Sequence, residues 1–294
     1  MASTPLLDRE FLEKLERLTL HWQKSFAGLV GGHNRSRFPG SGQEFLDHRN
    51  FHHGDDLRAV NWRAYMRLEK LFLKMFQVEP RVPVRMLVDI SASMTAYDGK
   101  KFEMARKLAA ALCYVGLVRL DTIEIHGFSN RLTQRTFSTG GRHRFKGVME
   151  SLSALTPGGA TDYLAVTREF ISDYSQRGLL VVISDFLDDN GCEKAIQYLS
   201  DYGHELPLIQ LWSDEDRTPP WVGELELRDA ETGAALKLDF DEAARERYTR
   251  AFDEYSAAIQ AMALRSGGRY AGVSTSQSLE TIIFGELIRV QGIA

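Results

Sequence analysis

Two carboxylates and three hydroxyls stand where they could bind a hard metal ion together. They follow apolar segments or lie in a glycine-rich loop, and they are Asp89, Ser91, Ser93, Thr161 and Asp185. This set contains oxygen donors only, without sulfur or imidazole. Such donors suit Mg²⁺ first, and Mn²⁺ or Ca²⁺ next, in preference to zinc. The residue types therefore predict a divalent-cation site, provided that the fold brings the five side chains together.

The spacing of these residues suggests how they would meet. In a loop that leaves a strand, the i, i+2 spacing of Ser91 and Ser93 lets both hydroxyls turn towards one point in front of Asp89. Asp185 follows a second apolar segment in the same way, and Thr161 lies in a glycine-rich loop that opens a helix. Ligands of doubly wound sheets bind beyond the carboxyl ends of the strands, where the strand order reverses. We expect the site at that edge.

The elements that would position the site are strands and helices in alternation. Short, continuously apolar segments are typical of parallel strands that helices cover on both faces. Strands are expected at 84–90, 122–128, 179–183, 208–212 and 269–273. Helical patterns are found at 100–119, 161–175, 241–266 and 276–289. This alternation predicts an α/β fold with a doubly wound, mostly parallel sheet.

Two segments interrupt the alternation. Residues 1–83 contain an amphipathic helix near 8–26, a glycine-rich stretch and a polar motif, and we expect them to pack on a core domain of residues 84–294. Residues 219–240 alternate in hydrophobicity on both sides of Asp-Ala-Glu-Thr-Gly, which predicts a small β-hairpin inserted into that domain.

The pattern Asp-x-Ser-x-Ser, followed later by a Thr and an Asp, resembles the metal-ion-dependent adhesion site of von Willebrand factor A and integrin inserted domains. The resemblance implies a von Willebrand factor A-like, Rossmann-type fold. It also implies that Ser91, Ser93 and Thr161 ligate the ion, while Asp89 and Asp185 act largely through water. Neutral hydroxyls leave the ion electron-poor, so an open coordination position would favour a carboxylate of another protein. The implied chemistry is binding, and the protein would not be an enzyme.

A second motif lies nearer the N-terminus. It consists of Gly42-Gln-Glu-Phe-Leu-Asp-His-Arg49, His53-Gly-Asp-Asp-Leu-Arg58, Asn61-Trp62-Arg63, Arg67 and Leu73-Lys74. With the later Asp-x-Ser-x-Ser, it resembles the bacterial and archaeal domain-of-unknown-function 58 family over nearly the whole chain. That resemblance implies a MoxR-type AAA+ ATPase as partner, often in chaperone-like or metal-insertion assemblies. The family usually has Ile-Asp-Trp where this chain has Val60-Asn61-Trp62, which removes a charge.

The centre of the second motif allows two interpretations. One is a buried ion-pair network that ties the N-terminal segment to the sheet through Asp55 and Asp56 and the nearby arginines. The other is a surface for a partner protein. The residues concerned are Gly54, Asp55, Asp56, Arg58, Trp62 and Arg63.

Composition limits the classes of function. The chain is 44% hydrophobic and 26% charged, as in soluble globular proteins, and its formal charge of −4 provides no general attraction for nucleic acid or an anionic membrane. It contains no apolar stretch long enough to span a bilayer and no signal-peptide pattern, so we expect a cytoplasmic protein. Cys113 and Cys192 are expected to stay reduced.

Two alternatives to the adhesion site stay open. A Mg²⁺-dependent phosphohydrolase could use Asp89 and Asp185, although aspartyl-phosphate phosphatases have a second Asp where this chain has Ser91, and use a lysine near the site. Signatures of other enzyme classes, such as a Walker loop or a nucleophile elbow, are not found. Alternatively, the polar residues at the strand ends could satisfy one another without an ion.

Overall fold

The computed structural model describes residues 6–18, 20, 37–39, 44–52, 55–57, 60–77, 83–139, 141–174, 176–187, 191–290 and 293. The chain divides into two compact units. The larger consists of residues 1–24 together with 82–294, and the smaller of residues 25–81. The candidate site belongs entirely to the larger unit.

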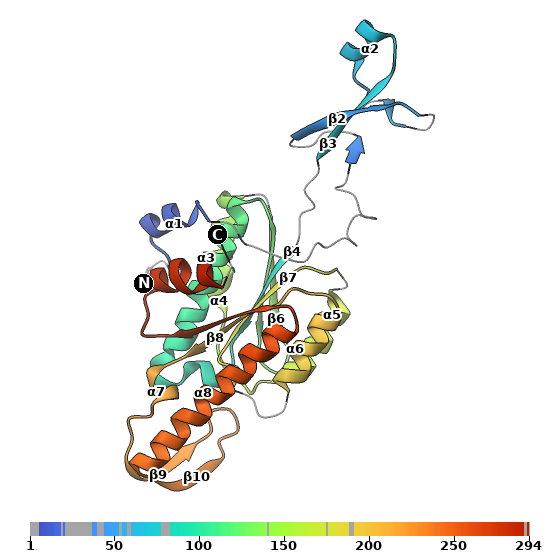
Figure 1. Ribbon diagram of the computed structural model, residues 1–294. Helices are drawn as coiled ribbons and strands as arrows, with labels where there is room; N and C mark the ends of the chain where they lie inside the picture. Colours follow the sequence, from blue (N-terminus) through green and yellow to red (C-terminus); the bar gives the residue numbers. More distant parts are fainter. Residues whose placement is uncertain are drawn as a thin grey trace. The chain divides into compact units, whose positions relative to one another are not determined.

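The larger unit is built on a sheet with the strand order β11-β8-β7-β4-β5-β6 (Figure 1). Its strands are β4 (Pro83–Asp89), β5 (Thr122–Phe128), β6 (Leu132–Ser138), β7 (Leu179–Ser184), β8 (Pro207–Trp212) and β11 (Arg269–Ser274). All neighbours pair in parallel except β6, which runs antiparallel to β5 at one edge. The predicted α/β fold with a mostly parallel sheet is therefore confirmed.

The order of the strands reverses beside β4. From β4 the chain first continues to β5 on one side and later returns to β7 on the other side. In open α/β sheets, a reversal of this kind leaves a crevice beyond the carboxyl ends of the two strands at which it occurs. The strands concerned are β4 and β7, which end in Asp89 and Ser184.

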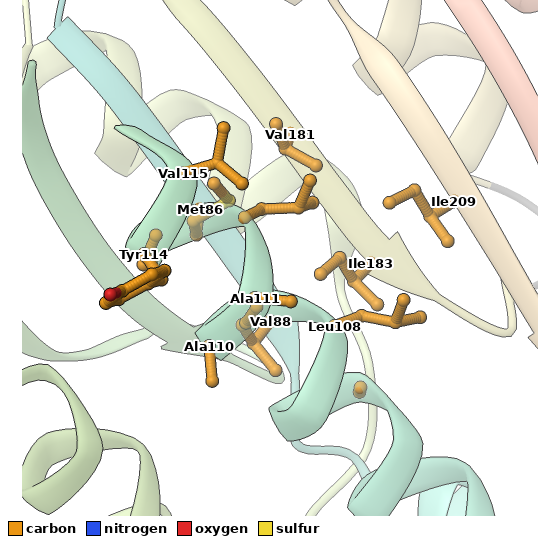
Figure 2. Packing of buried hydrophobic residues seen from close by; sticks show 14 of the residues in the cluster. Met86, Val88, Leu108, Ala110, Ala111, Tyr114, Val115, Val181, Ile183 and Ile209 are labelled. Atoms are coloured by element: carbon orange, nitrogen blue, oxygen red, sulfur yellow. The ribbon is translucent and has the colours of Figure 1, made fainter. Parts of the chain in front are cut away.

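Alternate residues of the central strands enter two separate hydrophobic clusters. In β4, Val84, Met86 and Val88 belong to one cluster, whereas Leu87 belongs to the other. Both faces are covered, so all seven residues of β4 are buried, which explains why apolar residues point to both faces of the strand. The buried Arg85 within the strand is paired with Glu124 at 2.8 Å. Figure 2 shows the first cluster, in which side chains of β4, β7 and β8 meet those of helix α3 (Lys100–Val118).

Helices cover the two faces of the sheet in two layers (Figure 1). The first cluster contains residues of α3, α4 (Phe145–Ala154) and α1 (Arg9–Leu15), and of the C-terminal α9 (Leu279–Thr281) with the π-helical turn Ile282–Leu287. The second contains residues of α5 (Tyr163–Asp173), α6 (Cys192–Asp201) and α8 (Glu242–Arg265). The four predicted helical segments are thus all present. Within the described residues, no helix has both the length and the apolar character needed to cross a bilayer.

Helix α1 belongs to the larger unit, although the sequence pattern groups it with the polar motif in residues 1–83. It contacts α3, and its Phe11 and Leu15 are buried in the same cluster as that helix. The helix ends at Leu15, well short of the predicted residue 26. Residues 21–26 lie outside the described part of the chain.

The predicted hairpin is present as β9 (Gly223–Arg228) and β10 (Ala235–Phe240), paired antiparallel. Side chains of β9 alternate between half-buried and exposed, as expected for a hairpin with one face towards solvent. Its turn contains Gly233 at φ +73°, a left-handed conformation that glycine adopts without strain. Beyond β8, the short helix α7 (Asp214–Arg217) precedes the hairpin.

The smaller unit contains a three-stranded antiparallel sheet in the order β1-β3-β2. Its strands are β1 (Arg37–Pro39), β2 (Glu44–Asn50) and β3 (Phe72–Gln77), and helix α2 (Trp62–Leu68) lies between β2 and β3 in the sequence. The side chain of Asn61 caps α2 by accepting a hydrogen bond from Ala64 N. Asn61, which carries an amide and no charge, thus serves as the cap of this helix.

Candidate functional site

Asp89 and Asp185 lie at the carboxyl ends of neighbouring strands. The register of β4 and β7 places Asp89 beside Ser184, the residue that precedes Asp185. The Ser184 hydroxyl donates to Asp89 Oδ2 over 2.5 Å and interacts with the hydroxyl of Tyr163 over 2.7 Å. Asp89 and Ser184 are both 0% exposed, so this contact is formed away from water.

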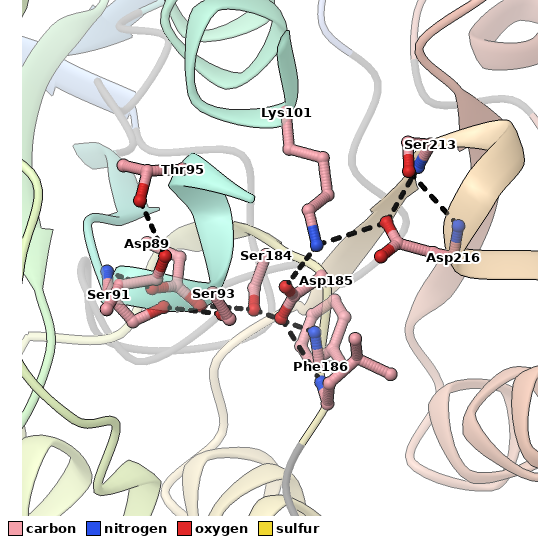
Figure 3. A network of polar contacts seen from close by, with 12 residues as sticks. Asp89, Ser91, Ser93, Thr95, Lys101, Ser184, Asp185, Phe186, Ser213 and Asp216 are labelled. Carbon is pink, nitrogen blue, oxygen red and sulfur yellow. Dashed lines mark hydrogen bonds and ion pairs between the residues drawn. The ribbon is translucent and has the colours of Figure 1, made fainter. Parts of the chain in front are cut away.

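The loop after β4 holds two serine hydroxyls close together (Figure 3). Ser91 N donates to Asp89 Oδ1 over 2.8 Å, which folds the loop back over the strand end. The oxygens of Ser91 and Ser93 are 2.9 Å apart. Ser91 is buried, and Ser93 is half-buried. The i, i+2 spacing thus brings two hydroxyls together next to a buried carboxylate.

The glycine-rich loop joins this site through its backbone. Gly158 N donates to the carbonyl of Ile90 over 2.6 Å, and Ala92 N donates to the carbonyl of Gly159 over 2.9 Å. Gly159 has φ +88°, which a residue with a side chain would adopt only under strain. These contacts fix the loop that carries Thr161 against the loop that carries Ser91 and Ser93.

Thr161 meets a carboxylate that the site prediction does not include. Its hydroxyl donates to Glu231 Oε1 and its backbone N–H donates to Glu231 Oε2, each over 2.8 Å. Glu231 lies in the turn of the β9–β10 hairpin, and both residues are half-buried. The hairpin turn therefore reaches the loop that follows α4.

Asp185 is paired with a buried lysine. Lys101 Nζ lies 2.9 Å from Asp185 Oδ2 and 3.1 Å from Asp216 Oδ2, as Figure 3 shows. The other oxygen of Asp185 accepts from Leu187 N over 3.2 Å. Lys101 is 1% exposed and Asp185 2%, so the pair is shielded from solvent. Asp216 is held in turn by a capping box with Ser213 at the start of α7.

The charges of this network do not cancel. Three buried carboxylates, Asp89, Asp185 and Asp216, share the network with one ammonium, that of Lys101. Burial works against the Lys101 ammonium, but Asp185 and Asp216 outweigh burial and raise its pKa. Burial and the neighbouring Asp185 raise the pKa of Asp89 to about 7, even though two hydrogen bonds favour its charged form. When all three carboxylates are ionised, two of their negative charges have no counter-charge in the network, and the raised pKa of Asp89 reflects the cost of this fully charged form.

The residues fit a divalent cation in donor type and in charge. The Ser91 and Ser93 hydroxyls lie together and Asp89 is beside them. In its fully ionised form the network has an excess of two negative charges, which a Mg²⁺ ion would neutralise. Thr161 lies on a loop bonded to theirs, although its hydroxyl is directed at Glu231. Among the described residues, no group of three or more His, Cys, Asp or Glu side chains is placed to hold a metal ion, so the candidate site depends on its hydroxyl donors.

Five residues of the network are absent from the sequence-based set, namely Lys101, Tyr163, Ser184, Asp216 and Glu231. For one of them, the amino-acid sequence contains a recognisable signal. Lys101 lies on the buried face of α3 at helical spacing from Ala105, Leu108 and Leu112, where a lysine needs a buried partner. The others depend on register or on long-range contacts, which no local pattern reveals.

The second motif lies within the smaller unit. Arg49 and Asp55 do form an ion pair at 2.6 Å, but their side chains are 42% and 18% exposed. Asp56 and Arg63 are exposed, as is Trp62 at 52%. Within the smaller unit taken by itself, these described charges form no buried network, and helix α2 has no buried residue. An ion-pair network that ties this unit to the sheet stays a prediction. Gly54 and Arg58 lie outside the described part of the chain.

Comparison with known families covers the candidate site and the second motif from residue 47 onwards. The model of the family described as "Protein of unknown function DUF58" matches residues 47–258, well over half of the chain. The chain belongs to this family. The DUF58 match includes the candidate site at β4 and β7 and the hairpin that carries Glu231.

Relatives of this DUF58 chain include uncharacterized proteins from Mycobacterium bovis and Mycobacterium tuberculosis. Each is 26% identical over 253 residues, which cover 83% of this chain and 78% of the relative. Among solved structures, it is similar to the conserved hypothetical protein BatB from Bacteroides thetaiotaomicron (TM-score 0.41, 18% identity, 71% of this chain and 98% of that one). An aerotolerance-related membrane protein from Bacteroides fragilis gives a TM-score of 0.39 at 21% identity, over 71% and 99% of the two chains.

Proposed function

We propose that this protein is a metal-dependent protein-binding module with a von Willebrand factor A-like fold and a metal-ion-dependent adhesion site. Ser91, Ser93 and Thr161 would ligate Mg²⁺, or Mn²⁺ or Ca²⁺ in its place, while Asp89 and Asp185 would act largely through water. An open position on the ion would then receive a carboxylate from a partner protein.

The observation that carries this proposal is the uncompensated negative charge of Asp89, which lies at the edge of the sheet where the strand order reverses. A buried carboxylate is tolerated only with a counter-charge or strong donors, and Lys101 is shared between two other carboxylates. Asp89 receives hydrogen bonds from the neutral donors Ser91 N and Ser184 Oγ, and its pKa still rises to about 7. A divalent cation in front of Asp89 would remove this imbalance. If the polar groups only formed hydrogen bonds with one another and no ion were bound, this imbalance of charge would stay.

The partner proposed for this module is a MoxR-type AAA+ ATPase in a chaperone-like assembly, with a client protein as a second source of the carboxylate. This partner is what the resemblance of the second motif implies, and the family match by itself assigns no partner. Within the smaller unit itself, Trp62, Arg63 and Asp56 are exposed, so that unit leaves these side chains accessible to a partner surface. The proposal places the protein in the cytoplasm, where an ATPase has access to ATP.

Capture of the ATPase tests this proposal. Tagged protein is incubated with the purified MoxR-type ATPase in Mg²⁺ or in EDTA, as wild type, Asp89→Ala and Ser91→Ala. Asp173→Ala and Ser153→Ala serve as matched controls because both residues are exposed and lie on helices away from the strand ends. We expect capture to fall in EDTA and in the two site variants, with the controls unchanged. Equal capture by all five proteins in both buffers would refute the proposal.

One observation favours the alternative of a Mg²⁺-dependent phosphohydrolase that uses Asp89 and Asp185. Lys101 supplies the lysine near the site that such enzymes use. A nucleophilic Asp89, however, would need a free and accessible oxygen, whereas both of its oxygens accept hydrogen bonds and the residue is 0% exposed. We therefore retain binding as the proposed function. Turnover of a phosphate ester with Mg²⁺ that is abolished by Asp89→Asn would reverse this choice.

A further inference from the structure

The hairpin turn brings a carboxylate of the chain itself to the candidate adhesion site. We propose that Glu231 is a resident acidic ligand of this site, which an acidic side chain of the partner protein must displace. The inference rests on the proposed function, because it assigns an occupant to the open position of the same ion. It also defines the partner's chemistry, since only an Asp or Glu side chain can replace Glu231 like for like.

The contact between Glu231 and Thr161 leaves both residues able to bind an ion. Each carboxylate oxygen of Glu231 accepts one hydrogen bond, from Thr161 N or Thr161 Oγ1, and so keeps a lone pair. The Thr161 hydroxyl acts as donor, which leaves its oxygen lone pairs available. The two charge-assisted hydrogen bonds thus bring a carboxylate and a hydroxyl together, and both groups keep lone pairs with which they could bind an ion.

The turn that carries Glu231 is organised before any ion binds. Asp229 Oδ1 accepts from the backbone N–H of Glu231 over 3.1 Å and from that of Thr232 over 2.6 Å, and Asp229 N donates to the carbonyl of Ala234 over 2.8 Å. These bonds lie within the turn, so its shape does not depend on packing against the sheet. The carboxylate is presented in a defined orientation.

The opposite end of the hairpin is attached beside the serine loop. Trp221, just before β9, stacks on Tyr97 with ring centroids 6.1 Å apart, and Tyr97 follows Ser93 by four residues. Between these two attachments the hairpin is largely exposed, with Leu236 63% accessible. The hairpin thus contacts two loops of the site and buries little of its own surface, so that a partner can displace its turn without unfolding the core.

Binding of Mn²⁺ alone, followed by water-proton relaxation, tests the inference without a partner. A bound carboxylate excludes water from the ion, so the relaxation enhancement per bound Mn²⁺ reports on whether Glu231 is a ligand. The variants are Glu231→Gln, which keeps the size of the side chain and one acceptor oxygen for Thr161 but removes the charge, and Glu224→Gln as the matched control, an exposed residue of the same hairpin. We expect Glu231→Gln to bind Mn²⁺ at least several-fold more weakly, with a higher enhancement per bound ion. Glu224→Gln is expected to match the wild type.

Two negative results have different meanings. If the wild type binds Mn²⁺, Asp89→Ala abolishes that binding, and Glu231→Gln has the wild-type affinity and enhancement, the inference is wrong while the metal site stands. If the wild type shows no saturable Mn²⁺ binding, both the metal site and the inference fall.

Discussion

The ammonium of Lys101 joins Asp185 to Asp216 at distances of 2.9 and 3.1 Å, with all three residues buried. This bridge connects the end of β7 to the short helix α7 and holds Asp185 at the edge of the sheet. Because the single ammonium serves two carboxylates, it does not also balance Asp89. The same bridge thus positions one acid of the candidate site and leaves the site negatively charged.

Replacement of Lys101 by Met is expected to destabilise the metal-free protein by roughly 3–5 kcal/mol, because it leaves Asp185 and Asp216 buried without their counter-charge. Urea denaturation in EDTA measures this change. Lys100→Met is the matched control, since the neighbouring lysine is exposed, and a change within about 0.5 kcal/mol is expected there. Equal effects of the two substitutions would contradict a structural role for the bridge.

The contribution of Asp89 to the stability of the metal-free protein is expected to fall as the pH rises from about 4 to about 7. Burial and Asp185 raise the pKa of Asp89 from 3.8 to about 7 in the folded state, so the fold disfavours the charged form. The resulting penalty is absent below the unfolded pKa and complete above the folded pKa, where it is on the order of 4 kcal/mol.

Asp89→Asn isolates this penalty. In EDTA, the free energy of unfolding of Asp89→Asn minus that of the wild type is expected to increase between pH 4 and pH 7 in urea titrations. Mg²⁺ is expected to reduce the difference at pH 7, since the ion stabilises the charged form of Asp89. A difference that does not vary with pH would show that burial does not penalise this carboxylate.

Ser184→Ala is expected to weaken Mg²⁺ binding by about tenfold, the loss typical when a residue that orients a metal-site carboxylate is removed. The Ser184 hydroxyl donates to Asp89 Oδ2 over 2.5 Å, and without it Asp89 loses one of the two donors that favour its charged form. Fluorescence-monitored titration with Mg²⁺ measures the affinity. Ser153→Ala, an exposed serine of α4, should bind as the wild type does. An unchanged affinity in Ser184→Ala would show that this hydroxyl does not position Asp89.

The sheet could be predicted because its strands carry the information locally. The continuous apolar segments at β4, β7 and β8 predict burial on both faces, and the structure confirms it. The edge strand β6 was not predicted. Its segment contains Arg135 and follows Arg131, and such a basic character is typical of a solvated surface. An edge strand is covered less completely than a central one, so its apolar pattern is weaker.

The candidate site was predictable only in its local part. The spacing of the two serines predicts that Ser91 and Ser93 meet, and the structure confirms it. The positions of Asp89 and Asp185 after apolar strands predict that both lie at the same edge of the sheet. The partners Lys101 and Glu231 could not be assigned, because their contacts span 84 and 70 positions of the chain. Such contacts depend on the packing of α3 and the hairpin against the sheet, which periodicity does not determine.

Calorimetric titration with Mg²⁺ at pH 7.5 tests the central claim most directly, with wild type, Asp89→Ala and the control Asp173→Ala. The reason is that Asp89 at the end of β4 and Asp185 just after β7 carry together more charge than Lys101 balances. We expect saturable binding of one ion to the wild type and to Asp173→Ala, and none to Asp89→Ala with its fold verified by circular dichroism. Absence of saturable heat in the wild type, or equal binding by Asp89→Ala, would contradict the account.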